Sequence, residues 1–479
     1  MKKQKMAMII LLLAVWGFPL TGWTSTSTTL HSFTGGTDGA IPNGDLILSG
    51  TKLYGMTSGG GNTNGDGVAF SLDPSNNSRF TAIHTFNGSD GAWPEGSFTL
   101  SGTKLYGMTS GGGDTHNDGA VFSIDLSNNN QYANIYSFNG TSGADPMGSL
   151  ILIGNKLYGT SSEYFTGGNG TIFSIDLSKN NQYAALHTFS GSDGANPFGS
   201  LILAGNKLYG MTSNGGSYGN GGVFSIDPSN NNQYSTVHSF TGTSTDGATP
   251  NGSLIFSGTK LFGMTEYGGG KNRGVIFSID LGNNNQYAML HSFTESGSDG
   301  AYPYGSLTLS EDGTLLYGMT CYGGNSNAGV IFSIGTDGSS FSTLYSFSGS
   351  TDGANPYGSL TLSADGTLLY GMTYGGGESN MGVIFSFPLS ASTSTGCTAV
   401  LNKSLGLHIP YITYPVPLLG TISLSADFTY VANPSLIVFE YIDAEDISNP
   451  SFSCTAATLS TSLLLHIPDV LLSDGITHV

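Results

Sequence analysis

The feature that most restricts the fold of this chain is a short string, KLYG(M)T in its commonest form, that recurs seven times. From the central glycine of the first copy, Gly55, to that of the last, Gly371, six intervals cover 316 residues, so the period is about 53 residues. A period of this length is typical of β-propeller blades, which contain four strands each. The central glycines are Gly55, Gly107, Gly159, Gly210, Gly263, Gly318 and Gly371.

Each repeat predicts four short strands, which in one copy read ALHTF, GSLILAG, KLYGMTS and GGVFSID. These runs are rich in β-branched and aromatic residues and are separated by turn signals such as PSNNNQY. They show little strict alternation, as expected where each sheet is packed on both faces by neighbouring blades. We therefore expect an all-β, seven-bladed propeller over residues 26–390, in which the mid-strand glycines allow close approach of an adjacent blade.

The two ends of the repeat array complement each other. The array begins with a lone strand of the ALHTF type, residues 28–33, and ends near Ser390 without such a strand. If this strand type is the outer one, residues 28–33 complete the blade whose other strands lie between Gly358 and Ser390. We expect this closure because it removes the exposed edges of an open array.

The repeated strings KLYG(M)T-S-GGG and GVIFSID resemble the GloVer-type tandem repeat of predicted secreted bacterial proteins. The resemblance covers about three quarters of the chain and is carried by all seven copies. It implies the architecture and export of the protein, but no activity, because none is common to that family. The strand order is also similar to that of kelch blades.

The first 25 residues have the order of a secretory signal peptide. Lys2, Lys3 and Lys5 precede an apolar run from Met6 to Leu20, and small polar residues follow. The alternative is an uncleaved membrane anchor, but a run of about fifteen apolar residues is short for a span. We expect a secreted protein, extracellular or at the cell surface with the periplasm as an alternative, and no transmembrane segment after cleavage.

The C-terminal part of the chain lacks the repeat. We interpret residues 391–396 as a linker and residues 397–479 as a small β-sandwich-like domain. Two similar strings in it begin at Cys397 and Cys454. These cysteines are candidates for a disulfide, and free buried thiols are the alternative.

Charge excludes some partners. The chain has 13 Lys and Arg against 32 Asp and Glu, a net charge of −19. Such an acidic surface repels nucleic acid and anionic membranes. We expect a monomer without cofactor or metal whose partner is a glycan or a protein.

Most repeated polar residues have a structural interpretation. The Asp that ends GVFSID is expected to cap the following turn, and the Asp of the DGAxPxG linker to bind local backbone amides. A histidine ends five outer strands, but the same position holds Tyr136 and Tyr345, which indicates packing and not metal binding. The residues concerned are Asp73, Asp125, Asp176, Asp227 and Asp280; Asp38, Asp90, Asp193, Asp246, Asp299 and Asp352; and His31, His84, His187, His238 and His291.

We expect a ligand-binding site at the positions where the repeats differ in sequence. The linkers and the Gly-rich loops between the second and third strands emerge on one face, where aromatic and neutral polar side chains suit a sugar or a peptide. The third repeat departs most, with Asp145, Glu163, Tyr164 and Phe165 in its two loops, although drift in a redundant repeat also explains it. The candidate ligand-binding residues are Trp93, Asp145, Glu163, Tyr164, Phe165, Phe198, Tyr267, Tyr302, Tyr304, Tyr322, Tyr357 and Tyr374.

The sequence favours binding over catalysis. It contains no GxSxG elbow, HExxH motif or P-loop, so no catalytic residue is assigned. A polysaccharide-acting enzyme is the alternative if carboxylates such as Glu95, Glu163 or Glu266 converge at the channel. A purely structural repeat protein is the third interpretation.

Overall fold

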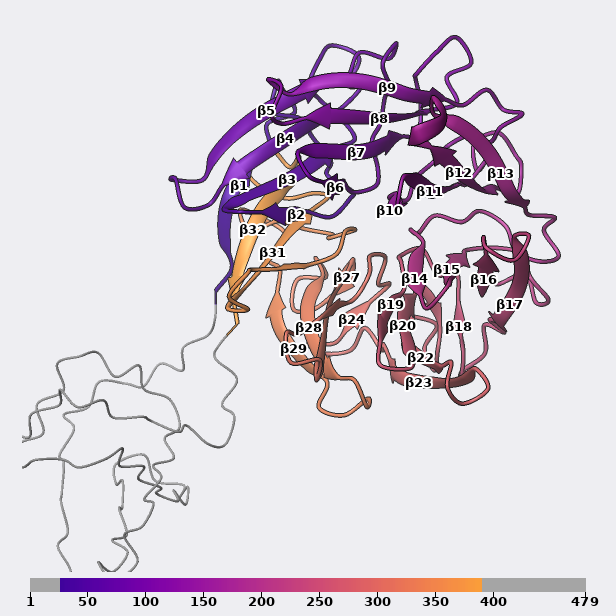
Figure 1. Ribbon diagram of the computed structural model, residues 1–479. Helices are drawn as coiled ribbons and strands as arrows, with labels where there is room; N and C mark the ends of the chain where they lie inside the picture. The colour runs from indigo at the N-terminus through magenta and orange to yellow at the C-terminus, as the bar shows by residue number, and fades with distance from the viewer. Residues whose placement is uncertain (1–25, 390–479) are drawn as a thin grey trace, which may run out of the picture. The chain divides into compact units, whose positions relative to one another are not determined.

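The computed structural model describes residues 26–389, which form seven four-stranded antiparallel sheets around a central channel (Figure 1). In each sheet the shortest strand faces the channel, and the fourth strand lies at the outer edge of the propeller. These residues also contain a single 3-10 turn, η1 (Leu177–Lys179), and no other helix. The predicted all-β, seven-bladed propeller is confirmed.

The strand bounds follow the repeat closely from blade to blade. From the channel outward, blades 1 to 4 consist of β2 (Ile47–Ser49), β3 (Lys52–Thr57), β4 (Val68–Asp73) and β5 (Arg79–Thr85); β6 (Thr99–Ser101), β7 (Lys104–Thr109), β8 (Ala120–Asp125) and β9 (Gln131–Ser137); β10 (Ile151–Ile153), β11 (Lys156–Ser161), β12 (Thr171–Asp176) and β13 (Gln182–Thr188); and β14 (Ile202–Ala204), β15 (Lys207–Thr212), β16 (Gly222–Asp227) and β17 (Gln233–Ser239). Blades 5 to 7 consist of β19 (Ile255–Ser257), β20 (Lys260–Thr265), β22 (Val275–Asp280) and β23 (Gln286–Ser292); β25 (Thr308–Leu309), β26 (Leu315–Thr320), β28 (Val330–Gly335) and β29 (Ser342–Ser346); and β30 (Thr361–Leu362), β31 (Leu368–Thr373), β32 (Val383–Pro388) and β1 (Thr28–Ser32). Two short ribbons pair β18 (Gly247–Ala248) with β21 (Tyr267–Gly268) and β24 (Gly300–Ala301) with β27 (Tyr322–Gly323).

The N-terminal strand closes the ring. Strand β1 pairs antiparallel with β32, with Thr28 opposite Ser386 and Ser32 opposite Val383. It is therefore the outer strand of blade 7, as the complementary ends of the array predict. Closure of this kind leaves no sheet edge between the first and last blades.

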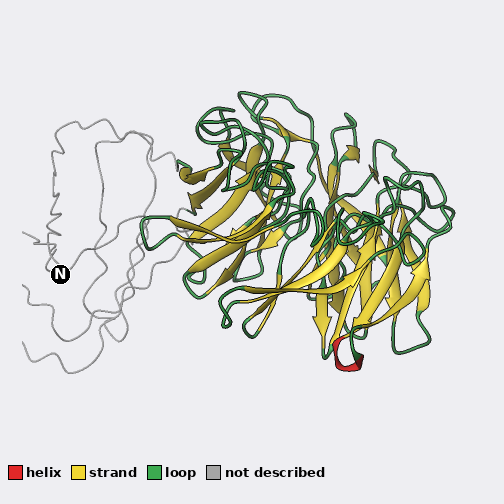
Figure 2. Cartoon of the chain, turned by 90° about the horizontal axis from the view of Figure 1, so that it is seen from above, coloured by secondary structure: helices red, strands yellow, loops and turns green. Residues whose placement is uncertain are grey.

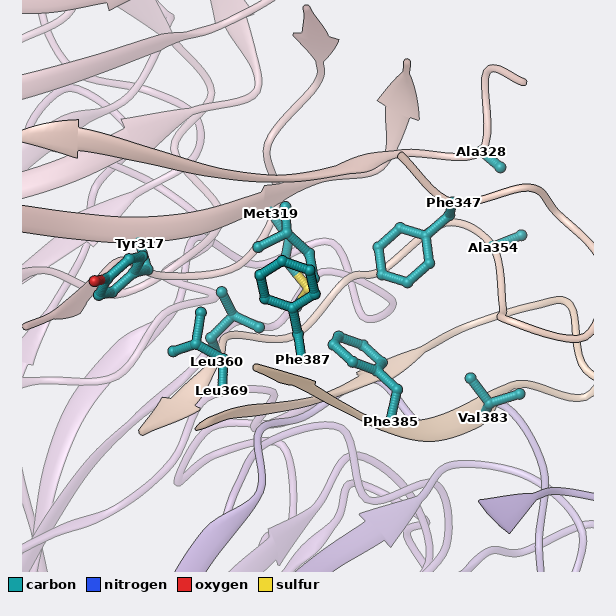
Figure 3. Close-up of a cluster of buried hydrophobic side chains, with 11 residues drawn as sticks. Tyr317, Met319, Ala328, Phe347, Ala354, Leu360, Leu369, Val383, Phe385 and Phe387 are labelled. Atoms are coloured by element: carbon teal, nitrogen blue, oxygen red, sulfur yellow. The ribbon is translucent and has the colours of Figure 1, made fainter. Parts of the chain in front are cut away.

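The hydrophobic core of the described residues is a ring of seven clusters, each between two neighbouring blades. Figure 3 shows the cluster between blades 6 and 7, where Met319 and Phe347 face Phe385 and Phe387. Phe347 and Phe385 are fully buried. Because every blade buries both of its faces in this way, removal of apolar surface from water stabilises the ring as a whole and not each blade separately.

The mid-strand glycines serve a different purpose from the one expected. A Cβ added at Gly55 would meet the ring of Phe70 and the side chain of Leu46, which belong to its own blade. The other six central glycines have the corresponding phenylalanine of their own sheet in the same place. The prediction that an adjacent blade approaches here is wrong: the space is filled by the cross-strand aromatic ring, whose packing on a bare backbone needs glycine.

A closed ring of hydrogen bonds joins the blades around the channel. After each linker the chain reads Gly-Ser, and the backbone N–H of one serine donates to the Oγ of the serine in the next blade. Blade 1 has Asp45 in place of serine; its N–H donates to Ser97 Oγ, and its Oδ1 accepts from the Ser359 N–H. The seven N···O distances lie between 2.5 and 2.8 Å.

The repeated aspartates make the expected backbone contacts. The carboxylate that ends GVFSID accepts the N–H two residues later in all five blades that carry it, for example from Ser229 to Asp227 at 3.0 Å. The linker Asp accepts a nearby N–H in all six linkers that carry it, for example from Thr241 to Asp246 at 2.9 Å. Both classes of Asp therefore fix turns.

The outer-strand histidines form a belt between blades. Each of the five binds the linker Asp through Nε2, at 2.9 to 3.3 Å, and stacks on the aromatic ring that begins the outer strand of the next blade. His238, for example, contacts Asp246 and lies 4.4 Å from the ring of Tyr287. Where the linker has Ser142 in place of Asp, the outer strand has Tyr136 in place of His, and that tyrosine stacks on Tyr183.

We expect Asp246→Asn to lower the free energy of unfolding by about 2 kcal/mol at pH 7, because the carboxylate accepts hydrogen bonds from His238, Thr241 and Gly247. Burial opposes ionisation of Asp246, but the bonds from His238 and Thr241 outweigh it and lower its pKa. A lowered carboxyl pKa stabilises the fold above the unfolded value of 3.8, and this contribution is lost as the pH falls through the folded value. Urea unfolding should therefore separate the two proteins at pH 7 and bring them together below pH 3.8. Equal stability at pH 7 would contradict this role.

Candidate functional site

Two sets of longer connections gather on one face of the propeller, here called the loop face. They are the loops between the second and third strands of each blade and the linkers between blades. In Figure 2 loops crowd the upper side of the described chain, whereas η1, in the turn between β12 and β13, lies on the lower side. The side chains predicted to bind a ligand are on the loop face.

The linkers hold an unusual backbone conformation at the first variable position of DGAxPxG. All seven residues there have positive φ, between 51° and 58°, although β-branched residues occur among them. Two backbone hydrogen bonds to different blades hold each one: Thr249, for example, donates to Asn220 O and accepts from the Glu266 N–H. Such a strained conformation persists only where the surrounding structure holds it. The seven positions are Ile41, Trp93, Asp145, Asn196, Thr249, Tyr302 and Asn355.

The residues after those prolines surround a hollow at the channel mouth. Its volume is about 300 Å³, and the residues of the Gly-Ser ring also line it. Tyr374, from the loop between β31 and β32, also lines it. Because each repeat supplies a residue from the same position, seven side chains surround the hollow: Asn43, Glu95, Met147, Phe198, Asn251, Tyr304 and Tyr357.

Aromatic side chains lie along much of the edge of the hollow, here called the rim. The ring centres of Tyr304 and Tyr357 are 4.8 Å apart, and those of Tyr357 and Tyr374 are 4.9 Å apart. Farther round the rim, Phe198 lies 5.4 Å from Tyr164 of the third blade. These rings offer flat apolar area with hydroxyl groups at its edge, which is the chemistry that binds sugars or peptides with little entropic cost.

Two carboxyl groups at the mouth have raised pKa values. Burial, reinforced by the carboxylate of Asp145, raises the pKa of Glu95 to about 7. Burial also raises the pKa of Glu266, although Asn251 Nδ2 donates to its Oε2 at 2.7 Å. Both carboxylates act on Tyr304, whose pKa is raised by burial and then by these charges. Tyr304 therefore lies within electrostatic reach of both carboxyl groups.

A second aromatic group lies beside the mouth on blades 5 and 6. The rings of Tyr267 and Tyr302 are 5.5 Å apart, and those of Tyr302 and Tyr322 are 5.8 Å apart. The guanidinium of Arg273 sits 4.9 Å from the centre of the Tyr302 ring and pairs with Glu295. These three tyrosines form a patch separate from the lining of the hollow.

The two loops of the third repeat contain two hydrogen-bonded carboxylates and two exposed aromatic side chains. Asp145 is 5 % exposed and accepts the N–H of Phe165, and Glu163 accepts from Thr171 Oγ1 at 3.1 Å. Both carboxylates therefore hold the loop in place. Tyr164 and Phe165 are exposed by 54 % and 68 %, and Tyr164 joins the rim through Phe198.

Sequence reasoning identified some residues of the hollow and missed others. Phe198, Tyr304, Tyr357 and Tyr374 line it, whereas the Trp93 indole lies against Gly111 outside the lining. Cys397 and Cys454, the candidate disulfide, lie outside the described residues. Asn43, Met147 and Asn251 were not singled out, although they occupy the same repeat position as Phe198.

Within residues 26–389, no three His, Cys, Asp or Glu side chains lie close enough together to hold a metal ion. The same residues contain no helix that is long and apolar enough to cross a membrane.

A family model described as the Gloeobacter/Verrucomicrobia repeat matches the chain three times, over residues 18–166, 117–315 and 297–406. The match bears out the resemblance to the GloVer-type repeat. No curated protein gives a significant match.

The solved structures to which this chain is similar include two putative 6-phosphogluconolactonases. The one from Bacteroides uniformis is 16% identical, covers 67% of this chain and 89% of its own, and has a TM-score of 0.46. The one from Bacteroides fragilis is 18% identical, covers 68% of this chain and 87% of its own, and has a TM-score of 0.44. A europium-containing methanol dehydrogenase is 11% identical, covers 76% of this chain and 93% of its own, and has a TM-score of 0.44.

Proposed function

We propose that this protein, which belongs to the Gloeobacter/Verrucomicrobia repeat family, is a secreted or cell-surface binding protein that recognises a carbohydrate chain at the mouth of its central channel. The observation that carries the proposal is the set of aromatic side chains around the hollow. Phe198, Tyr304, Tyr357 and Tyr374 line it together with the Gly-Ser residues of the blades. Export is proposed from the leader-like first 25 residues.

The position of the rings favours a chain-like ligand over a small compact one. Tyr304, Tyr357 and Tyr374 form a continuous series of contacts at one side of the mouth, and Phe198 with Tyr164 extends the aromatic area on the third and fourth blades. Sugar rings present apolar C–H faces to such side chains and hydroxyl groups to neighbouring Asn and Tyr groups. An oligosaccharide of several units can therefore contact the rim and the hollow together.

We expect Tyr357→Ala to weaken oligosaccharide binding roughly tenfold or more, because Tyr357 contacts both Tyr304 and Tyr374 and its loss opens the centre of the aromatic series. A glycan array would first identify a binding oligosaccharide, and calorimetry would then compare the variants. Tyr218→Ala is the matched control, because Tyr218 is 62 % exposed on another loop and does not line the hollow. Equal affinities for the wild type and Tyr357→Ala would place the binding site elsewhere, and an array without any hit would contradict the proposed function.

A polysaccharide-acting enzyme is the second candidate, favoured by one observation. The pKa of Glu95 is raised to about 7, as in a general acid, and the pKa of Glu266 at the same mouth is also raised. The two functions differ in outcome: an enzyme would shorten the bound oligosaccharide over hours, and Glu95→Gln would abolish the cleavage. A ligand recovered intact supports binding alone.

A further inference from the structure

A second cavity, here called the turn-face cleft, lies between blades 1 and 2 on the face opposite the loop face. Its volume is about 320 Å³. It opens beside the turns that join β4 to β5 and β8 to β9, which correspond to the turn with η1 on the lower side of Figure 2. It shares no lining residue with the hollow at the channel mouth. The two cavities are therefore separate sites.

Two rows of polar side chains of blade 1 form one wall of the turn-face cleft. In the outer row, Asp73 lies opposite Arg79, and the register of β3 with β4 brings Lys52 beside the same aspartate. The next row consists of Tyr54, Ser71 and Thr81, which pair across the same three strands. Lys52 and Arg79 are thus two strands apart, about 10 Å at the backbone, and both side chains line the one cavity.

Blade 1 differs from the other blades at one of these cations. Arg79 is one of two arginines in the chain, and the other, Arg273, is paired with Glu295. In three other blades a glutamine at the position of Arg79 accepts a hydrogen bond from an asparagine of its own turn, which an arginine, having no acceptor, cannot do. The residues at this position in blades 2 to 5 are Gln131, Gln182, Gln233 and Gln286.

The two cations of the cleft are not compensated. Neither Lys52 nor Arg79 makes a salt bridge within residues 26–389. Asp73 lies between them, but its Oδ1 accepts from the N–H and the hydroxyl of Ser75, at 3.1 and 2.6 Å. The equivalent aspartates hold the same turn in four blades that have glutamine, so Arg79 is not required to neutralise Asp73. The charged residues that line the cleft are thus two cations and one anion, on a chain with a net charge of −19.

Buried hydroxyl groups beside the cations are a second, independent sign of a ligand. Tyr54 is 8 % exposed and Ser71 is 7 % exposed. Both line the cleft, and neither hydroxyl has a hydrogen-bond partner in the described part of the chain. Tyr54 also packs in the same apolar cluster as Ile83 and Leu126, which line the cleft and give it apolar area. The cleft therefore combines positive charge, hydroxyl groups and apolar surface.

We infer that the turn-face cleft binds one uronic acid sugar, whose carboxylate pairs with Arg79 and Lys52. A guanidinium presents parallel N–H groups that match the two oxygens of a carboxylate. The hydroxyls of Tyr54 and Ser71 can bind the hydroxyls of the sugar, and Ile83 and Leu126 can contact its C–H groups. The cavity volume lies at the lower end of the range for ligand sites, which suits a single sugar unit. This site goes beyond the proposed function, since it does not include the hollow at the channel mouth.

The test is a calorimetric titration of the full chain at pH 7 and low salt with glucuronate, glucose and glucose 6-phosphate. We expect glucuronate to bind at least roughly tenfold more tightly than glucose, because hydrogen bonds between charged groups contribute about that factor. Arg79→Gln restores the residue found in blades 2 to 5, so the variant should fold, and it should lose this preference. Lys271→Gln is the matched control: it removes one positive charge from an exposed position in the loop between β21 and β22, and it should keep the preference.

Four results would overturn the inference. The first is that glucuronate does not bind or binds no more tightly than glucose. The second is that glucose 6-phosphate binds more tightly than glucuronate and loses affinity in Arg79→Gln, which would make the ligand a phosphate. The third is an equal loss in Arg79→Gln and Lys271→Gln, which would reduce the effect to net charge. The fourth is a loss of glucuronate binding in Tyr357→Ala, which would place the sugar in the hollow at the channel mouth.

Discussion

Gly199→Ala is expected to destabilise the propeller by more than about 4 kcal/mol, a loss among the largest that one methyl group causes. A Cβ at Gly199 would lie well under 3.0 Å from the carbonyl oxygen of Gly252 in the next blade, closer than real Cβ atoms come. Neither backbone can withdraw, because the N–H of Ser200 is bonded to Ser253 Oγ at the same point. Thermal unfolding of the purified variant measures the loss, and failure to accumulate folded protein is the extreme form of it.

Gly205→Ala is the matched control for that experiment. Gly205 has φ of +63° in a turn, and a Cβ there would meet nothing within 4 Å. Its replacement therefore costs only the left-handed backbone conformation, about 1 kcal/mol. If Gly199→Ala destabilised no more than Gly205→Ala, the contact around the channel would be looser than the structure has it.

The close contact at Gly199 is one of seven. Each glycine of the Gly-Ser pairs has the carbonyl oxygen of the next such glycine where its Cβ would lie, and the series closes from Gly358 to Gly44. The blades therefore meet at the channel backbone to backbone, and the hydrogen bonds of the serine ring follow from this contact. A methyl group at one position must push two neighbouring blades apart. The six other contacts around the channel are equally close, so the ring cannot absorb this displacement elsewhere.

The blade itself was predictable because its signals are local. Four apolar runs separated by turn residues predict four strands, and the lone strand of residues 28–33 predicts closure from the sequence order alone. The capping role of Asp227 was predictable for the same reason, since its partner Ser229 is two residues away. None of these inferences needs knowledge of which blades are in contact.

The linker conformation could not be predicted from local rules. A residue before proline favours extended backbone, and β-branched residues avoid positive φ, yet Ile41 and Thr249 have φ of 58° and 54°. The reason is not local: hydrogen bonds to two different blades hold each residue in this conformation. The contacts between blades in the closed ring impose the strain.

The hollow was only partly predictable for a related reason. Its aromatic members attract notice in the sequence, but Asn251 resembles any loop asparagine until Glu266 is seen beside it. The central glycines show the same limit, since the identity of the group above Gly55 depends on the rotamer of Phe70. Repeat position alone would have found all seven rim residues, because the residue before each Gly-Ser or Gly-Asp pair faces the channel.

Glu95→Gln is expected to stabilise the free protein by up to about 3 kcal/mol at pH 8 and to have no effect at pH 4. The unfolded pKa of 4.5 rises to about 7 in the folded state, so the folded protein binds the proton more tightly. A raised carboxyl pKa destabilises the fold as the pH rises from 4.5, and the penalty is complete above 7. Glutamine is neutral throughout, so it removes this penalty. Urea unfolding at the two pH values measures the difference. Glu311→Gln is the control for overall charge, because Glu311 is exposed on the turn between β25 and β26, away from the hollow.

A gain in stability at pH 8 together with a loss of ligand affinity would identify Glu95 as a functional group. A residue that serves only packing should not stabilise the protein when its charge is removed, whereas a charge kept for a ligand destabilises the empty site. Asp145 lies beside Glu95 but is bonded to the Phe165 N–H, so its own charge is already partly compensated within the third-repeat loop. An unchanged stability at pH 8 would mean that water or a neighbouring group already compensates the charge of Glu95, and this sign of a functional role would be lost.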